Sequence, residues 1–265
     1  NSKTVADGSL HNSPVMILSD GKPNPGGWHG TPPNFNPLHP VVQGYVDAQI
    51  DEMLELYSES PAFKGITMHL TKHTIPWFGA IEAGYNDYNI DAFEKDTGTK
   101  VEVDRKDPLR GKLYYNWLMA NARDKWIQWR CAKLADWYKA IAGRMAAKRP
   151  DLKLSLCSYN PTISDHSGDK RFKQQDFSDI IDKESGIDSR MYEGVPNIIL
   201  TQTIYPADYR QMSDVPWVAS ARSSIRDDYM KPGLYSMLNS ASFPWINMHD
   251  RYFEDAVGRE GKWWG

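Results

Sequence analysis

The sequence predicts an α/β protein with parallel strands. Short, nearly continuous apolar segments alternate along the chain with amphipathic helical patterns. Apolar segments of this kind are typical of strands that are buried on both faces, and each crossover helix between two parallel strands covers one face of the sheet. The loops between these elements are long, and long loops in a compact domain often carry a functional site.

Five segments have the pattern of a buried strand. They are short apolar runs bounded by turn residues, and they lie at Val15 to Ser19, Gly65 to Leu70, Leu152 to Ser158, Ile198 to Tyr205 and Trp245 to His249. A closed (β/α)8 barrel of the TIM type has eight strands. The chain therefore either holds further strands within its loops or is an incomplete barrel, a piece of a longer polypeptide.

Three helical stretches lie between these strands. Pro40 has the position of a first-turn proline, and apolar residues form one stripe of the segment that follows. A second helix is expected from Asp87 to Asp96, ended by Gly98. The third stretch, from Leu113 to Lys148, would exceed about 50 Å if unbroken, so we expect a bend or two separate helices before Pro150 ends it.

The composition favours one domain over residues 1–265. A chain of 265 residues, 40% of them hydrophobic, can bury one large core. The formal net charge is −3 and no cluster of Lys and Arg follows one face, so a nucleic-acid partner is not expected. No apolar run approaches the roughly 20 residues that span a bilayer. Cys131 and Cys157 have no metal-site spacing and are expected to be buried free thiols.

Several common enzyme classes have no signature in this chain. No glycine-rich dinucleotide loop, Walker loop or Gly-x-Ser-x-Gly elbow follows any expected strand. The commonest nucleotide-binding and serine-hydrolase interpretations are therefore removed, and no cofactor is expected.

Glu82 is the first candidate for a catalytic carboxylate. It follows the strand at Gly65 to Leu70 and has apolar and aromatic neighbours in the sequence. Desolvation among such neighbours favours the protonated form that a general acid needs. The structural alternative is an exposed loop residue. Asp87, further along the same segment, fits a helix N-cap better than a catalytic role.

Asp250 and Glu254 are the candidates for a second carboxylate. They follow the last expected strand, in a polar and aromatic cluster where Asn247 and His249 are expected to bind substrate. A nucleophilic or basic carboxylate at the end of a late strand has this context. A structural role for Asp250, paired with Arg251 or with a backbone amide, is the alternative.

His69 and His73 have an H-x-x-x-H spacing. On a helix this spacing aims both imidazoles at one metal ion. Here His69 ends a strand and His73 lies in a loop that contains Pro76. Contacts to sugar hydroxyl groups, or plain packing, are therefore favoured over a metal ion.

Aromatic side chains are abundant, with 10 Trp and 14 Tyr. Flat rings both fill cores and stack on sugar faces. Those in expected loops or at strand ends are candidates for sugar stacking, and they are Trp28, Trp77, Tyr85, Tyr205 and Trp217. Trp126 and Trp129 lie in a helical pattern, where packing is the better account, and Arg130 is expected to tether that helix through an ion pair.

Five segments together resemble a known family. They are Asn36-Pro-Leu-His-Pro40, Phe63-Lys-Gly-Ile66, Gly84-Tyr-Asn-Asp-Tyr-Asn-Ile-Asp-Ala-Phe-Glu-Lys-Asp-Thr-Gly98, Trp126-Ile-Gln-Trp-Arg130 and Arg149-Pro-Asp-Leu-Lys-Leu154. The chain from Asn36 to Glu254 resembles bacterial glycosyl-hydrolase-like barrel proteins. These are the "family 10-like" sequences of polysaccharide-degrading bacteria, which are distantly similar to the family 42 β-galactosidases. The motifs indicate the barrel framework more than the reaction.

The resemblance implies positions for two carboxylates. In such families the acid/base residue follows the fourth barrel strand, often as Asn-Glu, and the nucleophile follows the seventh. Glu82 matches the first position loosely, because Ile81 stands where Asn is expected, and Glu254 matches the second. The strand at Gly65 to Leu70 would then be about the fourth, with the first strands upstream of this chain.

One interpretation combines these observations. The chain is expected to be a glycoside hydrolase that cleaves a plant or algal oligosaccharide, with Glu82 as proton donor and Glu254 or Asp250 as nucleophile or base. The resemblance implies a secreted or periplasmic protein of polysaccharide degradation. Two alternatives stay open: a barrel that binds sugar without cleaving it, and a metal-dependent sugar isomerase or hydrolase that uses His69, His73 and a carboxylate.

Overall fold

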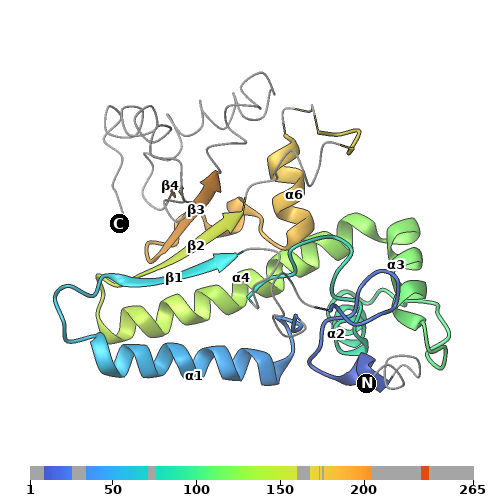
Figure 1. Ribbon diagram of the computed structural model, residues 1–265, viewed down its shortest axis with the longest axis horizontal. Coiled ribbons are helices and arrows are strands. Elements are labelled where there is room, and N and C mark those ends of the chain that lie inside the picture. The colour runs from blue at the N-terminus through green and yellow to red at the C-terminus, as the bar shows by residue number, and fades with distance from the viewer. Residues whose placement is uncertain are drawn as a thin grey trace. The chain divides into compact units, whose positions relative to one another are not determined.

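The structure is a computed structural model of the chain (Figure 1). It describes residues 9–25, 34–70, 76–159, 168–172, 174, 176–204 and 234–238. The chain divides into two compact units. Unit 1 holds residues 1–60, 70–138 and 183–188, and unit 2 holds residues 61–69, 139–182 and 189–265.

Unit 2 contains a four-stranded sheet. Its strands are β1 (Gly65–Leu70), β2 (Lys153–Tyr159), β3 (Ile198–Ile204) and β4 (Leu234–Leu238), and they lie side by side in that order. β2 pairs in parallel with β3, and β3 with β4. Figure 1 shows β1 running in the same direction as β2. The predicted α/β arrangement with parallel strands is confirmed, whereas a closed barrel is not formed by the residues that the structure describes.

β1 is buried on one face only. Ile66 is buried and the adjacent Thr67 is exposed, and this alternation continues to the end of the strand. The expectation of strands buried on both faces is therefore wrong for β1, because successive side chains of a strand point to opposite faces. In β2, by contrast, the adjacent Leu156 and Cys157 are both buried.

The first residue of β1 has to be a glycine. Gly65 has a φ of 152°, and a Cβ placed there would lie 1.9 Å from the carbonyl oxygen of Lys153. The two backbones approach so closely because Lys153 N donates to Lys64 O at 3.0 Å. Glycine, which has no Cβ, is the residue that permits both the conformation and the approach.

Two of the helices of unit 1 follow the sequence prediction closely. α1 (Pro40–Tyr57) begins at Pro40, and His39 caps it by accepting a hydrogen bond from Val41 N at 3.3 Å. α2 (Asp87–Thr97) ends at Gly98, which has a φ of 68°. Its N-cap residue is Asn86, so the predicted cap at Asp87 is one residue too late, and Asp87 is the first helical residue.

The long helical pattern is divided into two helices, as expected. α3 (Arg110–Asn121) is followed by its C-cap residue Ala122, and α4 (Arg123–Lys148) comes directly after it and contributes residues to both units. The predicted apolar stripe of α4 is buried, and it consists of Leu134, Trp137, Tyr138, Ile141 and Met145. Within unit 1, Trp137 Nε1 donates to Asp47 Oδ1 of α1 at 3.1 Å.

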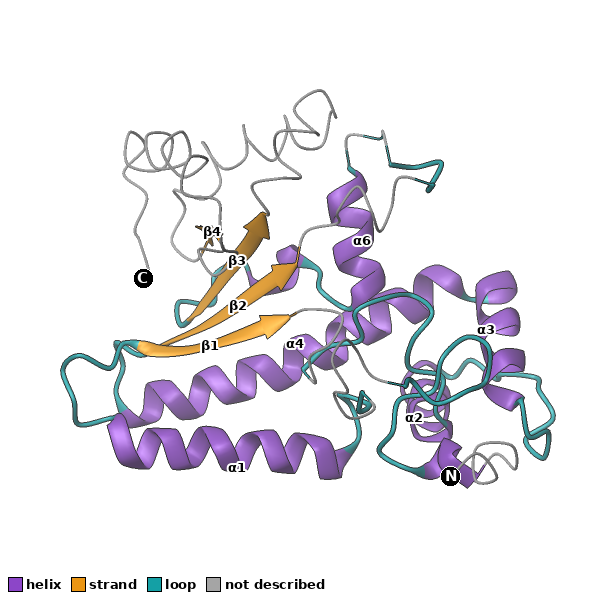
Figure 2. Cartoon of the chain, viewed as in Figure 1, coloured by secondary structure: helices purple, strands orange, loops and turns teal. Residues whose placement is uncertain are grey.

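The remaining elements were harder to predict. The segment from Val15 to Ser19 forms isolated antiparallel bridges, to Phe35, Pro23 and Ala83, instead of the expected strand. Two short 3-10 helices, η1 (Ser9–Asn12) and η3 (Ser189–Tyr192), and the helix α6 (Phe177–Ser185) have no counterpart in the prediction (Figure 2). The strand expected at 245–249 lies outside the described residues.

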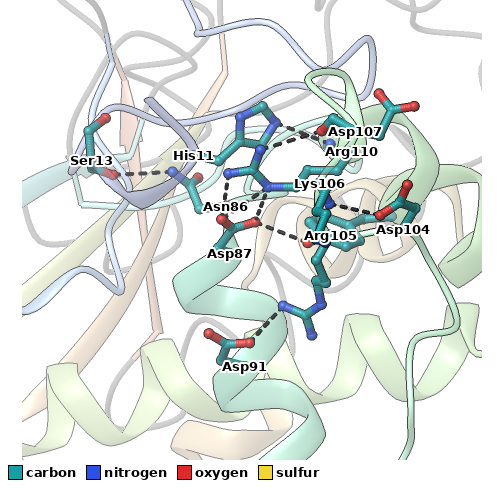
Figure 3. Close-up of polar contacts among 12 residues, drawn as sticks. His11, Ser13, Asn86, Asp87, Asp91, Asp104, Arg105, Lys106, Asp107 and Arg110 are labelled. Carbon is teal, nitrogen blue, oxygen red and sulfur yellow. Dashed lines mark hydrogen bonds and ion pairs between the residues drawn. The ribbon is translucent and has the colours of Figure 1, made fainter. Parts of the chain in front are cut away.

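A buried polar network joins the segments of unit 1 (Figure 3). Asn86 Oδ1 accepts from Ile17 N at 3.0 Å, and Asn86 Nδ2 donates to Val15 O at 2.7 Å, so the cap residue of α2 also fixes the N-terminal segment. His11 Nε2 accepts from Gly111 N at 3.1 Å. Buried polar groups need partners of this kind, and here they bind the chain start to α2 and α3.

Cys131 and Cys157 are buried thiols that are not joined in a disulfide, as expected. No helix within the described part of the chain is long and apolar enough to cross a membrane.

Candidate active site

Glu82 lies on a turn between β1 and α2 that is bounded by two glycines. We call residues Gly79 to Gly84 the Glu82 turn. Gly79 and Gly84 have φ angles of 78° and 96°, values that favour glycine. A Cβ on Gly84 would lie 2.6 Å from Phe78 Cε1, so the turn packs its backbone directly on that ring.

The N-terminal segment holds one side of the Glu82 turn. Ser19 N donates to Glu82 O at 2.6 Å, and Gly84 N donates to Ile17 O at 2.9 Å. Leu18 and Ala83 form an antiparallel bridge between these two hydrogen bonds. The short apolar run at Val15 to Ser19, predicted as a strand, thus serves to fix the backbone on which Glu82 stands.

Arg130 of α4 holds the other side. Its side chain is fully buried, its Nη2 donates to Ala80 O at 2.8 Å, and its Nη1 donates to Ile81 O at 3.4 Å. The guanidinium also lies 4.0 Å from the centre of the Phe78 ring. Burial lowers the pKa of Arg130. Arg130 was predicted to form an ion pair. Its partners are instead the carbonyl oxygens of Ala80 and Ile81 and the face of the Phe78 ring.

Tyr85 lies in the core directly behind the turn. Its hydroxyl donates to Ile81 O at 2.5 Å, and its ring packs edge-on against Tyr115 at 5.2 Å and parallel to Trp126 at 5.8 Å. The ring is fully buried, and this burial raises the pKa of Tyr85 far above its usual value. Because neither face is open, the placement of Tyr85 is that of a core residue and not of the sugar-stacking residue expected from the sequence.

Glu82 itself is exposed. Its apolar neighbours Ile81 and Ala83 turn inward and are buried, whereas the carboxylate points to solvent. Glu82 is therefore not buried as expected from the sequence, because its apolar neighbours in the chain do not cover its side chain. An accessible carboxylate on a fixed backbone can donate or accept a proton at a bound ligand.

A second carboxylate, Glu184, approaches the same region from α6. Gly186, which follows it, has a φ of 105°, and a Cβ there would lie 3.1 Å from Phe78 Cδ2. The Glu82 turn and the end of α6 therefore meet at two edges of one Phe78 ring. Glu184 is buried, and its Oε1 accepts a hydrogen bond from Arg123 Nη2 at the start of α4.

Tyr115 of α3 is influenced by the charges of both carboxylates. The pKa of Tyr115 is raised by burial first and then by the negative charge of Glu82, and Glu184 adds to this effect while Arg123 opposes it. Tyr115, Glu184 and Arg123 were not predicted from the sequence. They come from three elements, α3, α4 and α6, and no short motif links Glu184 of α6 to the other two.

The other residues predicted for the site fall into two groups. Trp77 is buried, so its ring also has the placement of a core residue, and His69 is exposed on β1 in unit 2. The rest lie outside the described residues, and they are Trp28, His73, Tyr205, Trp217, Asn247, His249, Asp250 and Glu254. Their predicted roles stay predictions. No group of three His, Cys, Asp or Glu side chains that could hold a metal ion occurs among the residues with described positions.

Comparison with known proteins identifies the family. A family model described as glycosyl hydrolase-like 10 matches residues 27–223, about three quarters of the chain. The chain belongs to the glycosyl hydrolase-like 10 family. The match confirms the predicted resemblance to glycosyl-hydrolase-like proteins, and it includes the Glu82 turn, Arg130 and Glu184. Asp250 and Glu254 follow the last matched residue.

The other two comparisons add no relative. No curated protein and no solved structure matches the chain significantly. The similarity to family 42 β-galactosidases and the bacterial origin, both expected from the sequence, therefore stay predictions for this member of the glycosyl hydrolase-like 10 family.

Proposed function

We propose that this chain is a glycoside hydrolase in which Glu82 donates a proton to the oxygen of the scissile glycosidic bond. The observation that carries the proposal is the exposed carboxylate of Glu82 on a turn whose backbone is held by the N-terminal segment, Arg130 and Tyr85. Membership of a glycosyl hydrolase-like family supports the same reaction class.

The reaction needs a second carboxylate on the other side of the bond. A carboxylate about 5 Å from the acid acts as nucleophile and retains the anomeric configuration, whereas one at roughly 6.5 to 9.5 Å activates a water and inverts it. We assign this role to Glu254 or Asp250. Glu184 is not assigned to it, because Glu184 is buried and bound to Arg123.

The substrate we propose is a plant or algal oligosaccharide, in a secreted or periplasmic protein whose full fold is a (β/α)8 barrel. These points rest on the family resemblance of the sequence. Direct measurements for them are release of reducing sugar from plant and algal oligosaccharides and fractionation of the native host.

A carbohydrate-binding protein without hydrolytic activity is the second candidate. It is favoured by the ion pair of Glu184, since this carboxylate, whose charge acts on Tyr115 together with that of Glu82, is already paired with Arg123. Such a protein would use Glu82 as a hydrogen-bond acceptor for sugar hydroxyl groups, and it would bind oligosaccharides and leave them intact.

The deciding experiment compares Glu82→Gln with the wild-type protein on two kinds of glycoside. Loss of a general acid slows substrates with poor leaving groups, such as natural oligosaccharides, by about 100-fold or more. Aryl glycosides with acidic phenol leaving groups need little protonation and should lose far less. Glu102→Gln is the matched control, because Glu102 is also exposed in unit 1 but lies outside the turn.

Three results are informative. A selective loss on natural substrates supports Glu82 as the acid. Equal hydrolysis by Glu82→Gln and wild type removes Glu82 from the reaction. Binding of oligosaccharides without any hydrolysis by the wild-type protein favours the carbohydrate-binding function.

A further inference from the structure

The carbonyl group that precedes Glu82 is held by two side-chain donors. Ile81 O accepts a hydrogen bond from the Tyr85 hydroxyl at 2.5 Å and a second from Arg130 Nη1 at 3.4 Å. Arg130 Nη2 reaches the carbonyl before it, Ala80 O, at 2.8 Å. Two consecutive peptide groups next to the exposed carboxylate are thus fixed from inside unit 1.

We propose that Tyr85 and Arg130 are positioning residues, which hold the Glu82 carboxylate in the geometry that the reaction requires. This inference rests on the proposed function of Glu82. An exposed glutamate on a loop has no packing of its own to fix its direction, so its placement depends on the backbone beneath it. Catalytic groups have to be held to within about 0.5 Å of their productive positions.

The two donors are themselves buried and packed against aromatic rings. Arg130 belongs to α4, and its guanidinium is packed on the Phe78 ring at 4.0 Å. The Tyr85 ring is packed between Tyr115 and Trp126, and Trp126 in turn stacks on Trp129 at 5.1 Å. The hydrogen bonds from Tyr85 and Arg130 therefore fix the backbone of the Glu82 turn relative to α4 and to this aromatic cluster.

The partners of Arg130 also fit a positioning role. Burying a guanidinium costs several kcal/mol, and here the charge is directed at two backbone carbonyls and an aromatic face. An apolar side chain of similar size would fill the same space without the desolvation cost. We therefore infer that the Arg130 guanidinium stabilises the conformation of the Glu82 turn more than it contributes to the packing of α4.

The test uses Tyr85→Phe, which keeps the ring and removes only the hydroxyl. We expect kcat to fall about tenfold, as a small misplacement of a catalytic group produces, while KM stays within about twofold because the substrate contacts are unchanged. Tyr114→Phe is the matched control. It also removes a buried hydroxyl from unit 1, one that donates to Asp87 Oδ1 at 3.0 Å, but that hydroxyl does not bind the turn.

A second readout does not depend on activity. Ser19 N donates to Glu82 O, so the exchange rate of the Ser19 amide proton reports how firmly the turn is held. By nuclear magnetic resonance, this rate should rise in Tyr85→Phe and stay unchanged in Tyr114→Phe. Arg130→Lys should raise it further if the variant folds.

The outcomes separate the two proposals. Faster exchange at Ser19 with a fall in kcat in Tyr85→Phe supports the positioning role. Unchanged exchange at Ser19, or faster exchange with an unchanged kcat, overturns it even when Glu82→Gln is inactive. A wild-type protein that hydrolyses no glycoside overturns the proposed function and the catalytic part of this inference together, and the exchange rates then decide only whether Tyr85 rigidifies the turn.

Discussion

Asp87 and Arg110 form a bidentate ion pair that joins α2 to α3. Arg110 Nε donates to Asp87 Oδ1 at 2.8 Å, and Nη2 donates to Oδ2 at 2.7 Å. Tyr114 adds its hydroxyl to the same carboxylate at 3.0 Å. Both charged side chains are about nine-tenths buried, and the carboxylate raises the pKa of Arg110.

Removing the charge of Asp87 should destabilise the protein strongly. Asp87→Asn leaves a buried guanidinium without its counter-charge, which costs about 3 kcal/mol or more. Urea unfolding followed by circular dichroism measures this change. The control is Asp91→Asn on the same helix, because Asp91 pairs with Arg105 at the surface and such pairs contribute about 1 kcal/mol or less. Similar decreases in the free energy of unfolding of the two variants would show that the buried ion pair of Asp87 is no more important than the surface pair of Asp91.

The backbone of the Glu82 turn should not accept a side chain at Gly84. In Gly84→Ala the new Cβ would meet Phe78 Cε1 at 2.6 Å, and the residue would also be held at a φ of 96°. Strain and crowding together are expected to cost about 2 to 4 kcal/mol. Gly98→Ala shares the positive φ, at 68°, but has open space around the Cβ, so it should lose only about 1 kcal/mol. Equal melting temperatures of the two variants would rule out crowding at Phe78.

Glu94 should contribute to stability in a way that depends on pH. Burial alone would raise the pKa of Glu94, but the hydrogen bond from Val101 N at 2.7 Å and the charges of Arg105 and Lys100 outweigh it and lower this pKa. A carboxyl with a lowered pKa in the folded state stabilises the protein above its unfolded pKa, about 4.3. This contribution is lost as the pH falls through the folded value.

The variant Glu94→Gln tests this dependence. At pH 7 its free energy of unfolding should be about 1 kcal/mol below that of the wild type, and the difference should shrink as the pH is lowered below about 4. Urea titrations at several pH values measure both quantities. A difference that is the same at pH 7 and pH 3 would show that the charge of Glu94 has no part in it.

The elements that could be predicted are those whose pattern is local. β1, β2 and β3 are short segments rich in apolar residues, α1 has its proline at the first position, and α2 has a glycine directly after its end. α6 also has a helical apolar pattern, in Phe177, Ile180 and Ile181, but it is short and follows a long loop. The prediction of a strand at Val15 to Ser19 was wrong. The backbone of so short a segment can also be paired through isolated bridges to three different segments.

The candidate site could be predicted only in part. Glu82 was found because it is a carboxylate in a long loop after a strand. The core roles of Tyr85 and Trp77 were missed. Their positions in an expected loop do not reveal that the folded protein buries both side chains. Glu184 is 102 residues from Glu82 in the chain, and its segment is brought to the Glu82 turn by the packing of Gly186 on Phe78.

The polar network at the start of the chain has a kinetic consequence. The hydrogen bond from Gly111 to His11 spans 100 residues, and the bond from Ile17 to Asn86 spans 69. Contacts of such high sequence separation require the closure of long loops, so they form more slowly than the hydrogen bonds within α2 and α3. We therefore expect the segment before α1 to dock on partners that have already formed, so that the residues that come first in the described chain are among the last to reach their final positions.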